Sequence, residues 1–150
     1  MASVILPPMG ILAELSAEER ADLGARGELF RYQKGDVVLE QGEPQGFLRY
    51  VVEGELGIST SSETAVAPLG YAHPGDCVGE MSLLDRVESV ARVVATAPST
   101  IWCLARDAFD AFCQQRPVAA VQLLKGIVRL MSRRLRTDDA RLVQAEEGQT

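Results

Sequence analysis

The sequence predicts a mainly β domain flanked by α-helices, in the α+β class. Between residues 29 and 104, short runs rich in β-branched residues alternate with turn signals about every 8–12 residues, a pattern typical of an antiparallel barrel or sandwich. A helix-start pattern precedes this region, and a helical periodicity of apolar residues follows it. We therefore expect one domain over residues 1–150, with a helical lead (9–27), a β-barrel (29–104), C-terminal helices (106–144) and a tail (145–150).

The composition is that of an ordinary single domain. The 150 residues are 47% hydrophobic and 24% charged. No apolar run approaches the roughly 20 residues that a membrane helix needs, and the first 15 residues lack the basic start of a signal peptide. Three cysteines at unrelated spacings do not form a disulfide framework. We therefore expect a cytoplasmic protein with no membrane partner.

The first helix and the strands follow from local signals. Ser16 stands at the N-cap with Glu19 three residues later, so a helix should begin here and end near Leu23, before Gly24 and Gly27. The strands should lie between turn pairs such as Lys34-Gly35 and Glu53-Gly54. We expect them over residues 37–39, 47–52, 56–60, 90–95 and 101–104, with a polar hairpin tip over 59–64.

Two helices are predicted after the last strand. Residues 106–116 have an amphipathic pattern, and Pro117 suits the first turn of a final helix that runs to about residue 144. On this helix apolar residues recur at alternating spacings of four and three, with Asp138 at one missing position. They are Leu124, Val128, Met131, Leu135 and Leu142. Such a stripe usually packs in a core, but it continues beyond the length that covers a small barrel, so we also expect a homodimer through it.

Positive charge is concentrated near the C-terminus, although the chain has a net charge of −6. The basic residues between positions 121 and 141 are Lys125, Arg129, Arg133, Arg134, Arg136 and Arg141. A block of this kind is typical of a nucleic-acid-binding surface or of a solvated helix face. We favour the solvated face, because the remainder of the chain is acidic and no recognition motif accompanies the arginines. No DNA-binding domain is expected in this chain.

The segment from Gly75 to Leu84 has the most specific pattern in the chain. A glycine-containing turn that leads into one helical turn directs free backbone N–H groups toward a common point, where an anion binds. Glu80 would repel a phosphate, but it would accept hydrogen bonds from the hydroxyls of a sugar. The residues alone leave two interpretations open: a site for a sugar phosphate, or an ordinary turn and short helix that fill a gap in the barrel.

Several short motifs along the chain occur in a specific order. They are YQKGD (32–36), EQGEP (40–44), YVVEG (50–54), the pairs Gly75-Asp76 and Gly79-Glu80 with Leu83-Leu84, and SRRLR (132–136). Together they resemble the cyclic-nucleotide-binding domain family, over about residues 9–142. The resemblance implies an eight-stranded jelly-roll-like barrel with flanking helices, a cyclic AMP or cyclic GMP ligand inside the barrel, and no further cofactor.

The resemblance also implies which residues contact the ligand. Residues 79–90 match the phosphate-binding cassette of the family, in which Glu80 would hold the ribose 2′-hydroxyl. The backbone around Met81 and Ser82 would face the cyclic phosphate. Val78 precedes this stretch and Gly79 opens it, and both belong to the predicted ligand site.

The sequence departs from the family near the end of this cassette. Many members place an arginine nine residues after the glutamate to pair with the phosphate, but here Ser89 is followed by Val90. Arg86 and Arg92 lie three residues to either side and are the candidate replacements. Losing one partner of such a pair typically costs about 2–5 kcal/mol. That is roughly a 30- to 4000-fold loss of affinity at about 1.4 kcal/mol per decade.

Three functions therefore remain open. In the first, the chain is a regulatory ligand-sensing domain whose final helix (117–144) moves on ligand capture and contacts a partner chain or an unidentified effector protein. Alternatively, it is a degenerate pseudo-receptor or interaction module that takes no cyclic mononucleotide, or takes a different ligand. A DNA-binding regulator is disfavoured, because no helix-turn-helix pattern follows the final helix.

Other residue types carry weaker signals. His73 is expected in a solvated turn, and Trp102 in the core. Cys77 is expected to pack as a small apolar group, the alternative being a redox-sensitive thiol beside the ligand site. Cys103 and Cys113 do not have zinc-site spacing. No nucleophile–base pair is evident, so we expect no enzymatic activity.

Overall fold

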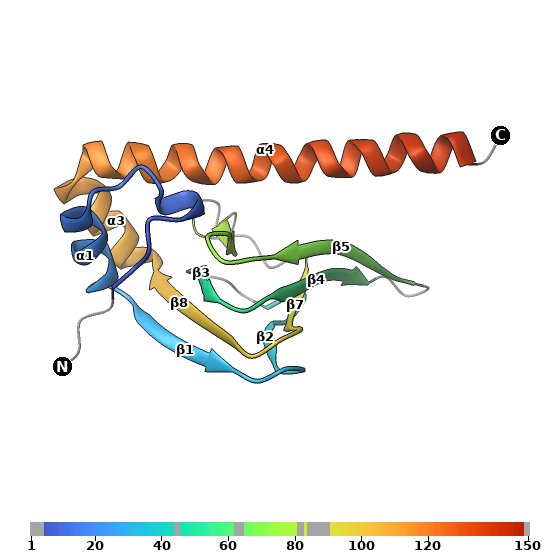
Figure 1. Cartoon of the computed structure of the whole chain (residues 1–150), viewed down its shortest axis with the longest axis horizontal. Helices are drawn as coiled ribbons and strands as arrows, with labels where there is room; N and C mark the ends of the chain where they lie inside the picture. The colour runs from blue at the N-terminus through green and yellow to red at the C-terminus, as the bar shows by residue number, and fades with distance from the viewer. Residues whose placement is uncertain (1–4, 44–45, 62–64, 81–82, 84–90, 149–150) are drawn as a thin grey trace.

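Two antiparallel sheets face each other at the centre of the molecule, in a computed structural model that describes residues 5–43, 46–61, 65–80, 83 and 91–148, with side chains through residue 137 (Figure 1). Within these residues each sheet has four strands, in the orders β1-β8-β3-β6 and β2-β7-β4-β5. The strands are β1 (Glu28–Tyr32), β2 (Val37–Leu39), β3 (Phe47–Glu53), β4 (Leu56–Ser61), β5 (Val66–Ala72), β6 (Cys77–Val78), β7 (Arg92–Ala95) and β8 (Ser99–Ala105). The fold is the predicted jelly-roll-like arrangement of antiparallel strands flanked by helices.

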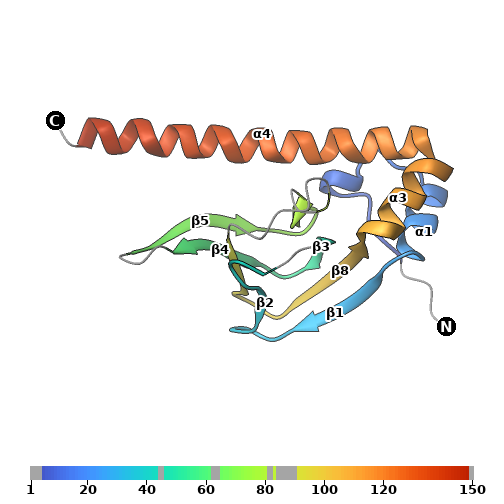
Figure 2. The same cartoon turned by 180° about the vertical axis from the view of Figure 1, so that it is seen from behind.

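The helices gather on one side of the sheets. They are η1 (Gly10–Leu12), α1 (Ala17–Gly24), α3 (Arg106–Gln115) and α4 (Pro117–Gly148). The predicted capping box is present, because Ser16 Oγ accepts from the Glu19 amide at 3.1 Å and Glu19 Oε1 accepts from the Ser16 amide at 2.8 Å. α4 begins at Pro117 as predicted, ends four residues later than predicted, and runs along the outside of the sheets (Figures 1 and 2). Among the described helices, none has the length and apolar content to cross a membrane.

Strand β8 separates two hydrophobic cores because its side chains alternate between opposite faces. Trp102 and Leu104 lie in the core beneath the helices, whereas Ile101 and Cys103 lie in the core between the sheets. Trp102 is fully buried, as predicted, and its indole N–H donates to the Gly24 carbonyl at 3.2 Å. The helices are thus fixed to one face of the first sheet, where Cys77 of β6 and Leu83 also enter the helix-side core.

The face of α4 that enters the core is not the predicted stripe. Leu123, Ile127 and Leu130 are the buried residues of α4 in the helix-side core. Within the predicted stripe, Val128 and Leu135 are each 62% exposed. Leu124 and Met131 are half-buried at the edge of the core, and the side chain of Leu142 lies outside the described residues. α4 therefore has one apolar face packed on the domain and a second one open to solvent.

Candidate functional site

The candidate site begins where β6 ends. β6 pairs with β3, with Cys77 opposite Tyr50 and Val78 opposite Arg49. Gly79 has a φ of 83°, a left-handed backbone conformation that favours glycine, and Glu80 then opens a helical conformation. The side chain at position 80 is therefore presented immediately after a sharp turn at the end of a strand.

Glu80 is a buried carboxylate with a charged partner. Its residue is only 8% exposed. Its Oε1 accepts a hydrogen bond at 3.0 Å from Arg134 Nη1, and its Oε2 lies 4.0 Å from the thiol of Cys77. Arg134 Nη2 also donates to the Cys77 carbonyl at 2.7 Å. One guanidinium from α4 thus holds both the backbone of β6 and the carboxylate that the resemblance assigns to the ligand.

The position of Arg134 follows from the phase of α4. Leu123, Ile127, Leu130 and Arg134 follow one another at spacings of four, three and four, so that Arg134 continues the core-facing series of the helix. From the sequence we grouped Arg134 with the solvated basic block, so its contact with Glu80 was not predicted. The signal that could have identified it is this phase, an arginine standing where the next core leucine would be.

A second contact joins α4 to the preceding turn. Arg133 Nη2 lies 3.9 Å from Asp76 Oδ1, and Asp76 Oδ2 accepts from the His73 amide at 2.9 Å. Arg133 is 62% exposed, so this ion pair is weak beside that of Arg134 and Glu80. Two consecutive residues of α4 therefore touch the His73–Glu80 stretch, one at its surface and one inside.

Two other predicted ligand residues, Val78 and Arg92, have different surroundings. Val78 is 4% exposed and packs in the core between the sheets. Arg92, a candidate replacement for the missing arginine, pairs instead with Glu40 at 3.1 Å and is 46% exposed. Met81, Ser82, Arg86, Ser89 and Val90 lie outside the described residues. The described part of the site is therefore Val78, Gly79 and Glu80, with Arg134 added from α4.

Cys77 packs as predicted. It is fully buried in the helix-side core. Burial, together with the nearby charge of Glu80, raises the pKa of its thiol well above the usual value, so Cys77 stays protonated at neutral pH. Since the thiolate is the reactive form, this environment disfavours the redox-sensitive alternative. Among the described residues, no group of His, Cys, Asp and Glu side chains is placed to hold a metal ion.

Known proteins match this chain over most of its length. The sequence profile described as "Cyclic nucleotide-binding domain" matches residues 29–116. Glutaminase 2 of Bradyrhizobium diazoefficiens is 29% identical over 93% of this chain, which spans 22% of that relative. A cyclic nucleotide-binding domain from Methylobacillus flagellatus has a TM-score of 0.81 at 23% identity, covering 87% of this chain and 74% of that one.

A further solved structure of the same fold carries a different description. The regulatory subunit of a cAMP-independent protein kinase A from Trypanosoma brucei has a TM-score of 0.69 at 21% identity, covering 86% of this chain and 48% of that one. Its fold is shared with the present chain. The matching sequence profile spans more than half of the residues here, and the fold and the Gly79-Glu80 turn agree with it. The chain belongs to the cyclic nucleotide-binding domain family.

Proposed function

We propose that this chain is a regulatory domain that captures a cyclic nucleotide, cyclic AMP or cyclic GMP, at Glu80 and transmits the capture to α4. The observation that carries the proposal is the contact of Arg134 with both the Glu80 carboxylate and the Cys77 carbonyl. This contact directly connects the ligand-binding carboxylate to the longest helix of the domain. The proposed role of the domain is regulatory rather than catalytic, as is typical of the family.

The chemistry of Glu80 supports this coupling. A carboxylate offers about four acceptor sites, and among the described contacts the neighbour of Oε2 is the weak thiol donor of Cys77, at 4.0 Å. A ribose hydroxyl that donates to Glu80 adds a strong, charge-assisted hydrogen bond to the same carboxylate. It thereby competes with, or reorients, the Arg134 guanidinium. A ligand can move a helix only if it interacts differently with the two positions of that helix. The Arg134 contact with Glu80 provides this difference, because it depends on the position of α4.

The solvent-facing stripe of α4 supports a homodimer. Val121, Leu124, Val128, Met131 and Leu135 fall at alternating spacings of three and four, and three of them are 49–62% exposed. Val121, Leu124 and Val128 line a shallow groove of about 380 Å³ together with Lys125 and Arg129. A second copy of α4 fits this pattern, because a heptad-like stripe packs best against another of its kind. An effector protein would then respond to the geometry of the paired helices.

The three cysteines are unpaired, which supports placement of the domain in a reducing cytoplasm. The chain spans about a fifth of the length of the glutaminase relatives that it matches. In those relatives, a domain of this family is part of a longer protein.

Thermal unfolding with added cyclic AMP or cyclic GMP tests the proposal. A ligand at 100 times its dissociation constant adds about 2.7 kcal/mol to the free energy of unfolding. Each kcal/mol raises the midpoint by about 2–4 °C for a chain of this size. We therefore expect a rise of about 5–11 °C at saturating ligand. Glu80→Gln should reduce this rise to near zero, because its amide is a weaker acceptor for the sugar hydroxyls.

The matched control is Glu28→Gln, which removes an exposed carboxylate from β1 and should keep the full ligand response. Absence of any midpoint shift with the unmodified protein at millimolar cyclic nucleotide contradicts the proposal. So does an equal response of the Glu80→Gln protein.

A pseudo-receptor is the second candidate, and two observations favour it. The phosphate arginine is replaced by Ser89, and Glu80 is already held by Arg134 within the domain. A solved structure of this fold is described as belonging to a cAMP-independent kinase, which is a precedent for the fold without that response. For this candidate the same titration gives no shift, and Arg134 serves as a permanent clamp of α4.

A further inference from the structure

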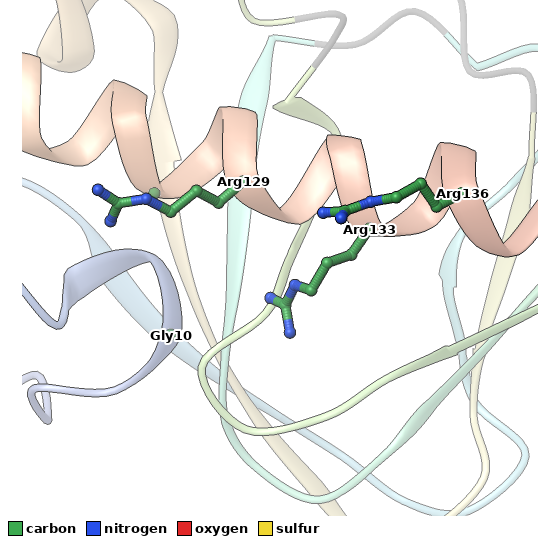
Figure 3. A pocket seen from close by; sticks show the side chains of 5 residues that line it. Gly10, Arg129, Arg133 and Arg136 are labelled. Atoms are coloured by element: carbon green, nitrogen blue, oxygen red, sulfur yellow. The ribbon is translucent and has the colours of Figure 1, made fainter.

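A groove of about 310 Å³ lies between α4 and η1, and Arg129 lines both this groove and the groove of the apolar stripe (Figure 3). Its lining residues are Gly10, Gly126, Arg129, Arg133 and Arg136. The proposed cyclic nucleotide site uses none of them. Three members of the basic block therefore share one concave surface, whereas Arg134 turns inward to Glu80.

The floor of this groove is fixed by close packing of two elements. A Cβ on Gly126 would come within 2.5 Å of the Ile11 carbonyl oxygen, so α4 and η1 approach to backbone contact at this point. Ile11 and Leu12 pack with Ile127 and Leu130 in the helix-side core. The groove is thus preformed, because both of its walls are anchored by buried residues.

The charge of the groove is strongly positive. Arg129, Arg133 and Arg136 extend over about 10 Å of α4 at 1.5 Å per residue, and their side chains leave the same side of the helix (Figure 3). Arg133 has Asp76 at 3.9 Å, and Arg136 Nε donates to the Ser132 carbonyl at 3.4 Å. Among the described contacts, Asp76 is the one carboxylate paired with these three guanidiniums. The groove therefore keeps a net positive charge on a chain whose overall charge is −6.

We propose that this groove binds a small molecule that carries two or more linked phosphate groups. Arginine is suited to phosphate, because its planar N–H groups make bidentate hydrogen bonds. Guanidiniums distributed over two helical turns match several phosphate groups better than one. The volume lies at the lower end of the range for small-ligand sites. The acidic body around the groove disfavours a long polyanion such as nucleic acid.

Calorimetric titration with inorganic tripolyphosphate tests this site, because the probe has linked phosphates and no sugar. We expect one tripolyphosphate per chain. Arg129→Gln and Arg136→Gln should each weaken binding at least tenfold, since each removes a charge-assisted bidentate contact. Arg136 is exposed and is not a lining residue of the groove of the proposed homodimer, so Arg136→Gln should keep the wild-type thermal midpoint. Arg31→Gln is the matched control, because it removes the same charge from an exposed position on β1 and should leave binding unchanged.

Three outcomes would overturn the assignment. The first is an equal loss in Arg31→Gln, which would indicate non-specific attraction to positive charge. The second is orthophosphate binding as tightly as tripolyphosphate at matched ionic strength, and the third is duplex DNA binding more tightly with the same dependence on Arg129 and Arg136. Glu80→Gln should bind tripolyphosphate normally, so failure of the cyclic nucleotide proposal and failure of this one give different results.

Discussion

Arg134 shows how one side chain can satisfy a buried charge and join two elements. Glu80 is 8% exposed, and an unpaired carboxylate at that depth would be strongly disfavoured. The guanidinium at 3.0 Å offsets this cost, and it also occupies the Cys77 carbonyl. Arg134 is itself 29% exposed at its side chain, so water partly screens the pair. Its contribution should therefore be smaller than that of a fully enclosed ion pair.

Removal of the guanidinium should expose this dependence. We expect Arg134→Gln to lower the free energy of unfolding by about 1–3 kcal/mol, because Glu80 is left without its cationic partner. In the double variant Glu80→Gln/Arg134→Gln the losses should not add, with a coupling energy of about 1 kcal/mol or more. Urea unfolding of the two single variants and the double variant at pH 7 measures this cycle.

The adjacent residue provides the control for this cycle. Arg133→Gln removes an exposed guanidinium whose carboxylate partner lies 3.9 Å away, so its effect should stay within about 0.5 kcal/mol. Additive losses in the cycle, or an equal loss in Arg133→Gln, would contradict the assigned role of Arg134.

At the same scale, the sequence singled out one member of the Glu80–Arg134 ion pair. Glu80 could be named from its motif, because the Gly79-Glu80 turn is local in the chain. Arg134 could not be assigned to it, since 53 residues separate the two and the basic block around Arg134 resembles a solvated face. Arg92 stays a predicted ligand residue, and in the structure its guanidinium pairs with Glu40 at 3.1 Å.

Between elements, a cluster of charges joins α1 to the start of the C-terminal helices. Asp22 of α1 accepts from Arg26 at 3.2 Å and from Arg116 Nε at 2.8 Å. Hydrogen bonding to Arg26, followed by that to Arg116, lowers the pKa of Asp22 below its ordinary value. Arg116 links α3 and α4, so this carboxylate fixes the helical lead to the C-terminal helices.

The sign of this pKa shift predicts an acid dependence of stability. Because the folded-state pKa of Asp22 is depressed, its stabilisation is present above the unfolded-state pKa of about 4 and is lost as the pH falls below that value. Asp22→Asn should therefore be less stable than the wild type at pH 7, and this difference should shrink toward pH 2–3. Urea midpoints at several pH values measure it.

The exposed carboxylate Asp110 of α3 supplies the comparison. The urea midpoint of Asp110→Asn should not approach that of the wild type to a comparable extent as the pH is lowered. A constant difference in urea midpoint between Asp22→Asn and the wild type across this pH range would contradict the stabilising role of the Asp22 ion pairs.

Elements were predicted well where their signals are local, and less well where packing decides. The capping box fixed the start of α1, and turn pairs predicted β2, β3, β4, β7 and β8, whereas β1, β5 and β6 were not among the expected strands. The orientation of α4 could not be deduced from periodicity, because the series Leu123, Ile127, Leu130 and the series Leu124, Val128, Met131 are offset by one residue. Close contact of Gly126 with Ile11 selects the first series as the core face.

For the whole molecule, the outward stripe of α4 predicts association. We expect the chain to sediment at about twice its 16.2 kDa mass at micromolar concentration. Val128→Glu should shift it to the monomer, because the added charge would be buried between the two paired α4 helices. Analytical ultracentrifugation measures both masses.

Thr137→Glu is the matched control for this substitution. Thr137 is exposed and lies nine residues from Val128, or two and a half turns at about 3.6 residues per turn, on the opposite side of α4. The Thr137→Glu protein should therefore stay dimeric. A monomeric wild type, or equal dissociation by both substitutions, would contradict the proposed homodimer through the apolar stripe of α4.

The shared use of α4 also limits how its length can change. Its core face, the Arg134 contact, the apolar stripe and the basic groove lie at different angles around one helix axis. A single residue inserted after Leu130 would rotate everything beyond it by about 100°, moving Arg134 out of reach of Glu80. An insertion of seven residues would rotate it by only about 20° but advance it by about 10 Å. The register of this helix is thus constrained in both rotation and translation.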